Sequence, residues 1–256
     1  MSNLNQPAAR AFERTVAVDW NDRVEHWEAV AASPAFTRFA AEVLTLAAPR
    51  PSDRVVDLGA GTGLLTLALA PYVEHVLAID SSEEMLIRLQ ANRLQRECDN
   101  VSTQVADLRA LPLGDESVSL AVSNYAFHHL DDSGKELALA EARRVLVPGG
   151  RLVICDMMFK LSIASRDRTI IRAKVWSIAK RGPSGLARLT RNAGRLATNR
   201  WERPSRAETW EAMLGRRRFS EVSVRLFDEN EAGIAYAERP ATTPSRWRTP
   251  LTGAAR

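Results

Sequence analysis

The sequence predicts an α/β protein whose central feature is a mostly parallel sheet with helices on both faces. Between residues 51 and 158, short β-rich segments alternate with segments of helical periodicity, which is typical of parallel strands joined by crossover helices. Near the C-terminus, two β-rich segments follow each other without a helix, which predicts an antiparallel hairpin at the edge of the sheet. Together these segments predict seven strands.

The expected elements follow one another along the chain. The strands are expected at Arg54–Leu58, His75–Asp80, Val101–Ala106, Val118–Ser123, Arg151–Cys155, Glu221–Asp228 and Gly233–Glu238. The helices between them are expected at Gly63–Ala70, Ser82–Gln95 and Lys135–Leu146, the last of which ends before Pro148-Gly149-Gly150. Either Ser81 or Ser82 is the expected N-cap of the second helix, because a serine side chain accepts hydrogen bonds from a free first turn.

Three further segments surround this core. Residues 1–50 are expected to form N-terminal helices that act as a lid, anchored by Trp20, Trp27, Phe36 and Phe39. Residues 51–240 form the main domain, with a helical insert at about 160–206. Residues 241–256 contain turn formers without periodicity and are expected to be a flexible tail.

Composition excludes several classes of protein. The chain has 256 residues, of which 45% are apolar and 26% charged, as in an ordinary globular domain rather than a disordered or collagen-like chain. Cys98 and Cys155 are too few for a disulfide framework or for a zinc site of their own, so we expect no metal. No signal-peptide pattern and no apolar run of about 20 residues is present, which predicts a cytoplasmic protein.

The segment from Val55 to Gly63 joins a strand to a helix through a turn with three glycines. In open α/β sheets, ligands bind beside such turns, and glycine lets the backbone approach the ligand closely. The dinucleotide fingerprint G-x-G-x-x-G does not fit, because Leu64 stands where the last glycine is required. Asp57 also argues against a pyrophosphate at this turn.

Three acidic residues end three successive strands of the expected sheet. Asp57 lies in the first strand, Asp80 closes the second and Asp107 follows the third. A carboxylate at the end of the second strand typically accepts hydrogen bonds from ribose hydroxyls. The three acids together suit a ligand that carries an ammonium, a ribose and an adenine, without phosphate.

These motifs resemble those of the class I S-adenosylmethionine-dependent methyltransferases. The segments that carry the resemblance are Asp57–Gly63, Asp80, Ala106-Asp107 and Leu111–Leu113. Two more segments, Ser123–Leu130 and Leu146–Gly150, look like the small-molecule branch related to the ubiquinone and menaquinone methyltransferases. The resemblance covers residues 51–158 and implies a Rossmann-like fold with S-adenosylmethionine as cofactor.

The resemblance also implies roles for individual residues. The glycines would pass beneath the methionine part of the cofactor, Asp57 would lie near its amino group, Asp80 would hold the ribose, and Asp107 with Leu108 would read the adenine edge. The cofactor-binding residues expected in this way are Asp57, Gly59, Ala60, Gly61, Gly63, Asp80, Ser81, Met85, Asp107, Leu108, Ser123 and Trp20.

His128 and His129 are the candidate catalytic residues. They are adjacent and follow the fourth strand, at the mouth of the expected site, and histidine is suited to act as a general base near neutral pH. The alternative is that they pack, cap the following turn or contact the substrate. Tyr125 and Asp156, which follow the fourth and fifth strands, are the expected substrate contacts.

The net charge of +4 conceals a strong asymmetry. Residues 160–206 contain 13 of the 35 basic residues but only two of the 31 acidic ones. The periodicity predicts a helical hairpin, with Ile171, Val175 and Ile178 on one stripe and Leu186, Leu189, Ala193 and Leu196 on another. This basic insert is read as a solvated face of a substrate cap, an attractant for an anionic substrate, or a site for anionic lipid. Nucleic acid is the partner least supported, because no nucleic-acid-binding motif is present.

The sequence therefore predicts methyl transfer from S-adenosylmethionine to an O, N or C atom of a small or lipophilic molecule. Three alternatives stay open: a membrane-associated lipid methyltransferase, an S-adenosylmethionine-using enzyme of another reaction type, and a cofactor-binding protein without catalysis. The oligomeric state is not predicted.

Overall fold

The computed structural model describes residues 24–159, 165–180, 182, 190, 203–227 and 232–241. Its centre is a seven-stranded sheet with the strand order β3-β2-β1-β4-β5-β7-β6. The strands are β1 (Arg54–Leu58), β2 (His75–Asp80), β3 (Val101–Val105), β4 (Val118–Asn124), β5 (Leu146–Met157), β6 (Ser220–Leu226) and β7 (Ala232–Glu238). β7 runs antiparallel to both of its neighbours, β5 and β6, while the pairs among β1 to β5 are all parallel. The predicted fold class is confirmed.

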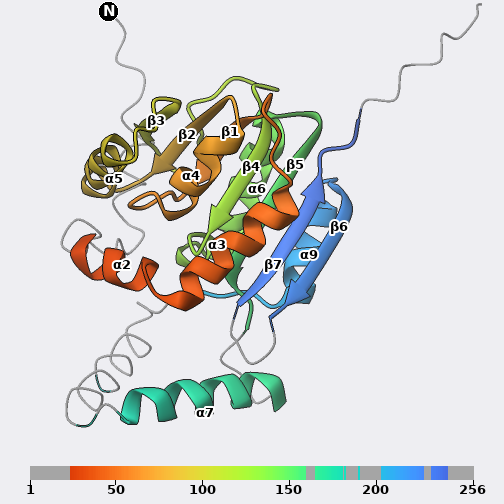
Figure 1. Cartoon of the computed structure of the whole chain (residues 1–256). Coiled ribbons are helices and arrows are strands. Elements are labelled where there is room, and N and C mark those ends of the chain that lie inside the picture. Colours follow the sequence, from red (N-terminus) through yellow and green to blue (C-terminus); the bar gives the residue numbers. More distant parts are fainter. Residues whose placement is uncertain are drawn as a thin grey trace, which may run out of the picture.

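Helices cover both faces of this sheet (Figure 1). They are α2 (Val24–Ala31), α3 (Pro34–Ala47), α4 (Leu64–Leu69), α5 (Glu83–Gln95), α6 (Asp132–Val145), α7 (Ser165–Ala179) and α9 (Ala207–Arg216). Two short 3₁₀ helices, η2 (Ala70–Tyr72) and η3 (Phe127–His129), complete the description. No helix of this described part is long and apolar enough to cross a membrane.

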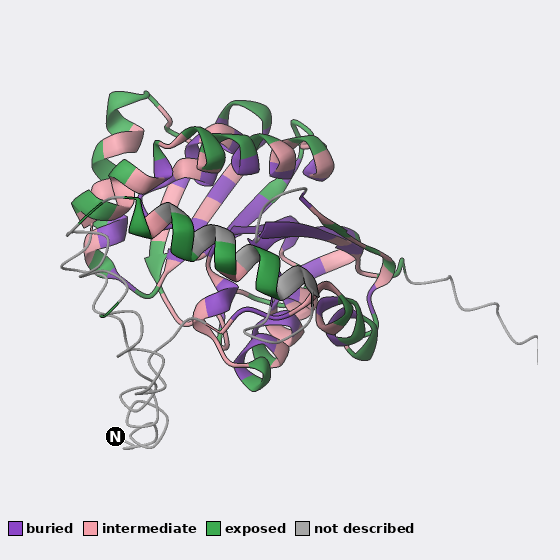
Figure 2. Cartoon of the chain, turned by 90° about the horizontal axis from the view of Figure 1, so that it is seen from below, coloured by how far each residue is buried: buried purple, intermediate pink, exposed green. Residues whose placement is uncertain are grey.

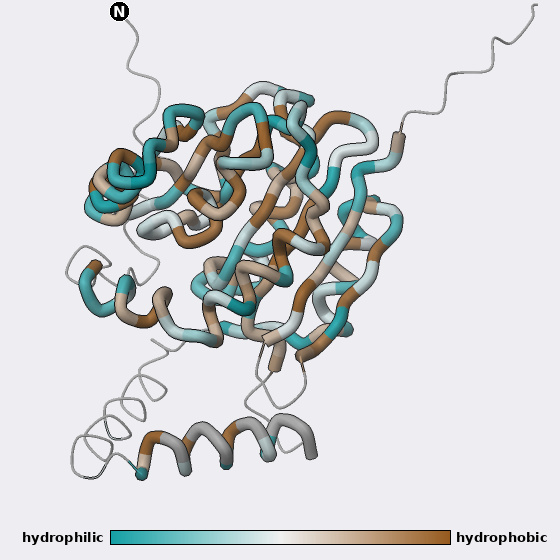
Figure 3. Tube along the Cα trace, in the orientation of Figure 1, coloured by the Kyte–Doolittle hydropathy of each residue, from teal (hydrophilic) through white to brown (hydrophobic). Residues whose placement is uncertain are grey.

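The parallel strands carry apolar residues on both faces, and each face has its own core. Val122 and Val153 belong to the core beneath α3, α4 and α5, whereas Ala121 and Leu152 belong to the core beneath α6 and α9. This pattern is expected because crossover helices exclude water from both faces of a parallel sheet. Buried residues accordingly concentrate in the central strands (Figure 2), and hydrophobic residues run along the same strands (Figure 3).

Several boundaries differ from those expected. α6 begins one turn earlier, at Asp132, because the Asp131 side chain caps the helix by accepting from the Gly134 N–H at 2.7 Å. β5 begins at Leu146, so the segment Pro148–Gly150 lies within the strand, where the pairing with β4 shifts register. Helix α9 was not predicted. It packs through Trp210, Met213 and Leu214 on the second core, an apolar face too short to stand out by periodicity.

The expected insert and lid are described in part. α7 lies within the expected insert and carries its expected first stripe, and the expected second stripe falls on residues outside the described ones. α2 and α3 are the described helices of the N-terminal segment, while Trp20 and the expected tail from residue 242 onward lie outside the described residues. In Figure 1, α2 and α7 lie on the side of the sheet where the arrow of β4 ends.

Candidate active site

The turn between β1 and α4 is built from glycines that other residues could not replace. Gly59 has φ +78°, and a Cβ added there would lie 2.2 Å from the Cβ of Ala126. Gly61 has φ +54°, and its Cβ would lie 2.9 Å from the Trp27 indole nitrogen. The turn therefore brings bare backbone close to η3 on one side and to α2 on the other, as the glycine pattern predicts.

Asp57 and Asn124 present two buried oxygen atoms without hydrogen-bond partners. Asp57 Oδ2 accepts a bond of 2.6 Å from the Thr66 hydroxyl, while its Oδ1 has none. Asn124 Oδ1, at the end of the neighbouring β4, also has none. Both side chains line a small cavity together with Trp27 and the backbone of the glycine turn. Buried acceptors without donors are costly, so this cavity is prepared for a ligand that supplies N–H groups.

Burial also controls the charge of Asp57. The side chain is 1% exposed, and burial together with the nearby Asp80 raises its pKa to about 7, although the Thr66 hydroxyl opposes the shift. A cationic group in the cavity would favour the ionised carboxylate. Ionisation of Asp57 and binding of a cationic ligand are therefore expected to favour each other.

Asp80 closes β2 and ties it to the glycine turn. Its Oδ2 accepts from the Gly61 N–H at 2.8 Å, and its Oδ1 accepts from the Ser82 N–H at 2.9 Å. Burial raises the pKa of Asp80, while these backbone bonds lower it in part. Ser82, rather than Ser81, caps α5 by accepting from the Met85 N–H at 3.2 Å. The expected ribose-binding carboxylate thus stands directly beside the glycine turn.

Asp107 is held by its own neighbour. Both carboxylate oxygens accept from the Arg109 guanidinium, at 2.5 Å for the shortest contact. Burial alone would raise the pKa of Asp107, but the hydrogen bonds from Arg109 outweigh it and lower the pKa. Leu108 is partly buried against the second core. The expected role of Asp107 and Leu108 at the adenine stays a prediction.

One of the expected cofactor contacts, Ser123, has its side chain bonded within the sheet. The Ser123 side chain is fully buried and donates a bond of 2.6 Å to the Leu58 carbonyl, so its hydroxyl is committed to the sheet. Its neighbour Asn124 lines the cavity instead. Because consecutive side chains of a strand point to opposite faces, the two cannot share this role. Trp20 lies outside the described residues, and Trp27 lies against Gly61 in the glycine turn.

Helix α2 is attached to the domain by two side chains. Trp27 lies against the glycine turn and contacts Phe36 edge-on, with ring centroids 5.3 Å apart. Glu28 accepts from the Asn92 amide at 3.1 Å and pairs with Arg88 at 3.6 Å, both on α5. Asn92 also donates to the Thr62 carbonyl of the glycine turn at 3.0 Å. α2 therefore covers the cavity and is fastened beside it.

His128 forms a buried pair with Asp156. The His128 Nδ1 lies 2.6 Å from Asp156 Oδ1, and the His128 backbone N–H donates to Asp156 Oδ2 at 3.0 Å. The Met157 N–H donates to the same carboxylate at 2.6 Å. The side chains of the pair are 5% and 0% exposed. A carboxylate on one ring nitrogen fixes the orientation of the ring and leaves the other nitrogen for a proton.

The two residues beside His128 have different surroundings. The His129 ring is tilted against the His128 ring, with centroids 4.0 Å apart, and is partly exposed. Tyr125 adopts φ +58°, which is strained for an aromatic residue, and packs against the rings of Phe36 and Phe39, with centroids 4.6 and 5.3 Å away. Asp156 acts on the His128 ring rather than standing alone at the site, a pairing that joins residues 28 positions apart. The predicted substrate contacts of Tyr125 and Asp156 remain untested.

Comparisons with known proteins agree with this geometry. Residues 55–150 match the family model described as a methyltransferase domain. A 37.1 kDa protein of a Streptomyces fradiae transposon, uncharacterised, is 34% identical over 197 residues, which are 73% of this chain and 55% of that protein. A demethylmenaquinone methyltransferase of Clavibacter sepedonicus is 39% identical over 109 residues, 43% of each chain.

One further relative and two solved structures are also similar to this chain, each over a different fraction of its length. A malonyl-[acyl-carrier protein] O-methyltransferase of Methylococcus capsulatus is 45% identical over 105 residues, which are 40% of this chain and 36% of that protein. This chain thus spans about half or less of the relatives named here. The crystal structure of a SAM-dependent methyltransferase from Aquifex aeolicus has a TM-score of 0.60 at 18% identity and covers 86% of this chain and 98% of its own. YcgJ of Bacillus subtilis has a TM-score of 0.59 at 18% identity, covering 79% and 98%. At these identities, the structures show a shared fold.

Proposed function

We propose that this chain, which carries a class I S-adenosylmethionine-dependent methyltransferase domain, transfers a methyl group to an O, N or C atom of a small or lipophilic molecule. The observation that carries the proposal is the pair of unpartnered buried oxygens of Asp57 and Asn124 beside the glycine turn. The α-ammonium of S-adenosylmethionine is a donor of the kind that these acceptors lack. When bound, the cofactor supplies a methyl group on a positively charged sulfur.

The residues around the cavity fit the rest of this cofactor. Gly59 and Gly61 bring bare backbone to the place where we expect the methionine part, and Asp80 has the place in the fold at which a carboxylate accepts bonds from ribose hydroxyls. Trp27 would cover the methionine part, and Met85 is buried in the first turn of α5, where we expect the adenine. We propose Ala60, Gly63 and Ser81 as further contacts of the cofactor.

His128 is the residue that we propose as general base. Methyl transfer to a weakly acidic hydroxyl or amine requires the acceptor to lose a proton, and positioning of the reactants supplies much of the remaining rate. Asp156 accepts a hydrogen bond from one ring nitrogen of His128, which holds the ring and would stabilise the imidazolium as the proton arrives. His129 is then a second candidate, partly exposed beside the same turn.

Cofactor binding is tested by calorimetry on the full chain with S-adenosylmethionine. Asp80→Asn removes the charge near the expected ribose, and we expect affinity to fall at least about tenfold. Asp99→Asn, an exposed position after α5, is the matched control and should bind like the wild type. Absence of binding to the wild-type chain would refute the proposal.

Transfer itself is tested with S-adenosylmethionine labelled on the methyl group and a solvent extract of small molecules and lipids as the acceptor pool. We expect label to enter the extract with the wild type. In His128→Gln the label should fall about 100-fold or more while cofactor affinity is kept. Full incorporation by His128→Gln would remove the assignment of the base, and cofactor binding without any transfer would favour a non-catalytic protein.

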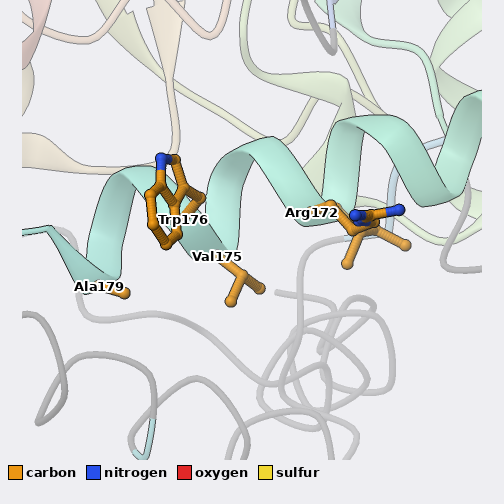
Figure 4. Close-up of a pocket in the computed structure, with 5 residues that line it drawn as sticks. Arg172, Val175, Trp176 and Ala179 are labelled. Carbon is orange, nitrogen blue, oxygen red and sulfur yellow. The ribbon is translucent and has the colours of Figure 1, made fainter.

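A second candidate is a reaction at an anionic lipid surface. α7 exposes Trp176 by 65% and Val175 by 45%, and Lys180 lies 5.2 Å above the Trp176 ring. A hollow of about 480 Å³ runs along this helix, lined by Ile171, Arg172, Val175, Trp176 and Ala179 (Figure 4). Exposed tryptophan beside basic side chains fits the headgroup region of an anionic membrane.

A further inference from the structure

Lys135 is a fully buried lysine that the proposed chemistry does not use. It lies in the first turn of α6 with 0% exposure. Its Nζ donates to the Ser205 hydroxyl at 2.9 Å and to the Arg203 carbonyl, and it pairs with Asp132 at 3.5 Å. Burying an ammonium costs free energy unless it is paired and hydrogen-bonded. Ser205, Arg203 and Asp132 supply these partners for Lys135.

Residues 203–205 are the stretch that returns from the basic insert to the domain, and they also contact the catalytic turn. The Arg203 backbone N–H donates to the His128 carbonyl at 2.7 Å. The Arg203 guanidinium pairs with Asp131 at 3.3 Å, and the Ser205 hydroxyl donates to Asp132 at 2.8 Å. One short segment is therefore held by the start of α6 on one side and by the backbone of His128 on the other.

Electrostatics connect the same lysine with the partner of His128. Burial lowers the pKa of Lys135, whereas the carboxylates of Asp132 and Asp156 raise it in part. The fully buried Asp156 thus has a cation near it in addition to its hydrogen bonds. The titratable and charged groups around the His128 turn are His129 on η3, Asp156 on β5, Asp131, Asp132 and Lys135 at α6, and Arg203 on the returning segment.

We propose that Lys135 is a positioning residue for His128: it fastens the returning segment 203–205 against the catalytic turn, so that the end of the basic insert and the orientation of the His128 ring are coupled. The inference rests on the proposed role of His128. The expected effect of removing Lys135 is local, because the hydrogen bonds of Lys135 and Arg203 hold one short segment and not the strands of the sheet. The basic insert would then influence the orientation of His128 through residues 203–205.

Hydrogen exchange on the full chain without cofactor tests this coupling. Lys135→Met keeps the apolar stem and removes the ammonium, and Lys180→Met makes the same change at an exposed position of the insert. In Lys135→Met, we expect the Arg203 amide to exchange at least about tenfold faster. The downfield proton on His128 Nδ1 should broaden, while strand amides such as that of Val122 exchange as in the wild type. Lys180→Met should change none of these.

The outcomes separate a positioning role from a general loss of stability. Faster exchange at Arg203 and Val122 alike, or no change at Arg203 in a folded Lys135→Met chain, overturns the proposal. If Lys135→Met does not fold, Ser205→Ala supplies the test, because it removes one acceptor and keeps the lysine; a local effect of smaller size supports the coupling and none refutes it. In the labelled-transfer assay, Lys135→Met should lose about tenfold with unchanged cofactor affinity. The exchange readout needs neither cofactor nor acceptor, so failure of the proposed methyl transfer would be seen separately.

Discussion

Asp57 shows how a single buried carboxylate links stability with ligand binding. One of its oxygens has a donor and the other has none, and its pKa is raised to about 7 by burial. A group whose folded pKa lies above its ordinary value of 3.8 binds more protons in the folded chain between about pH 4 and 7. The contribution of Asp57 to the free energy of unfolding therefore falls as the pH rises through this window. Its charge is unfavourable for folding and favourable for a cationic ligand.

Asp57→Asn should separate the two effects. Asparagine stays neutral, so above pH 7 we expect the free energy of unfolding to rise by on the order of 2 kcal/mol, measured by urea denaturation. Affinity for S-adenosylmethionine should fall about tenfold or more and lose its increase from pH 6 to 8. Asp99→Asn is the exposed control for both measurements. An unchanged affinity in Asp57→Asn would show that this carboxylate does not receive the ammonium.

Some individual residues of the site could be predicted from the sequence and others could not. The glycines, Asp57 and Asp80 stand at positions that a strand–turn–helix pattern marks, and the structure places them together. Asn124, whose side chain lines the cavity, was not predicted although its neighbour Ser123 was, because the choice depends on which face of the sheet each side chain of β4 points to. The alternation of side chains along a strand gives the two residues opposite directions, and one sequence does not say which of them faces the ligand.

Helix α2 is the element that decides access to the cavity. Trp27 lies over the glycine turn, and Glu28 fastens the helix to α5 through Asn92 and Arg88. Because Asn92 also holds the Thr62 carbonyl, the fastening reaches the turn itself. Partly exposed ion pairs and hydrogen bonds of this kind contribute modestly, so the helix is expected to open without global unfolding.

Glu28→Gln should therefore speed the exchange of the cofactor. It removes the charge that pairs with Arg88, and we expect the rate of S-adenosylmethionine dissociation to rise about two- to tenfold in stopped-flow tryptophan fluorescence. Glu25→Gln, on the exposed side of the same helix, serves as the control. Identical rates in Glu28→Gln and the wild type would argue against α2 as a lid.

At the scale of the whole molecule, charge is divided between the domain and the insert. The segment 160–206 carries 13 basic and two acidic residues, and the rest of the chain has more acidic than basic residues. α7 is the described helix of this insert, and none of the α7 side chains that the structure describes is buried. The insert begins after β5 and returns at residues 203–205 beside His128, so its charge stands near the expected entrance for a substrate.

Flotation with vesicles tests whether the basic insert binds to an anionic lipid surface. We expect the chain to float with phosphatidylglycerol vesicles at low salt, less so at high salt, and not with phosphatidylcholine vesicles. Trp176→Ser combined with Arg172→Glu should reduce flotation several-fold, whereas Arg96→Glu, an exposed charge reversal on the domain, should not. Equal binding to both vesicle types, or none, would favour a soluble anionic substrate or a solvated cap.

Local pattern by itself determined the seven strands, the glycine turn and the acids at the strand ends, because these follow from alternation, turn chemistry and spacing along a short stretch of chain. Only the tertiary structure decided that Asp156 partners His128, that Trp27 covers Gly61 and that Lys135 meets Arg203 and Ser205. Each of these contacts joins residues that are distant in sequence, and none leaves a periodic signal. The physical reason is that the composition of a site depends on strand order and on how helices pack across it, whereas the identity of an element depends mainly on its neighbours in the chain.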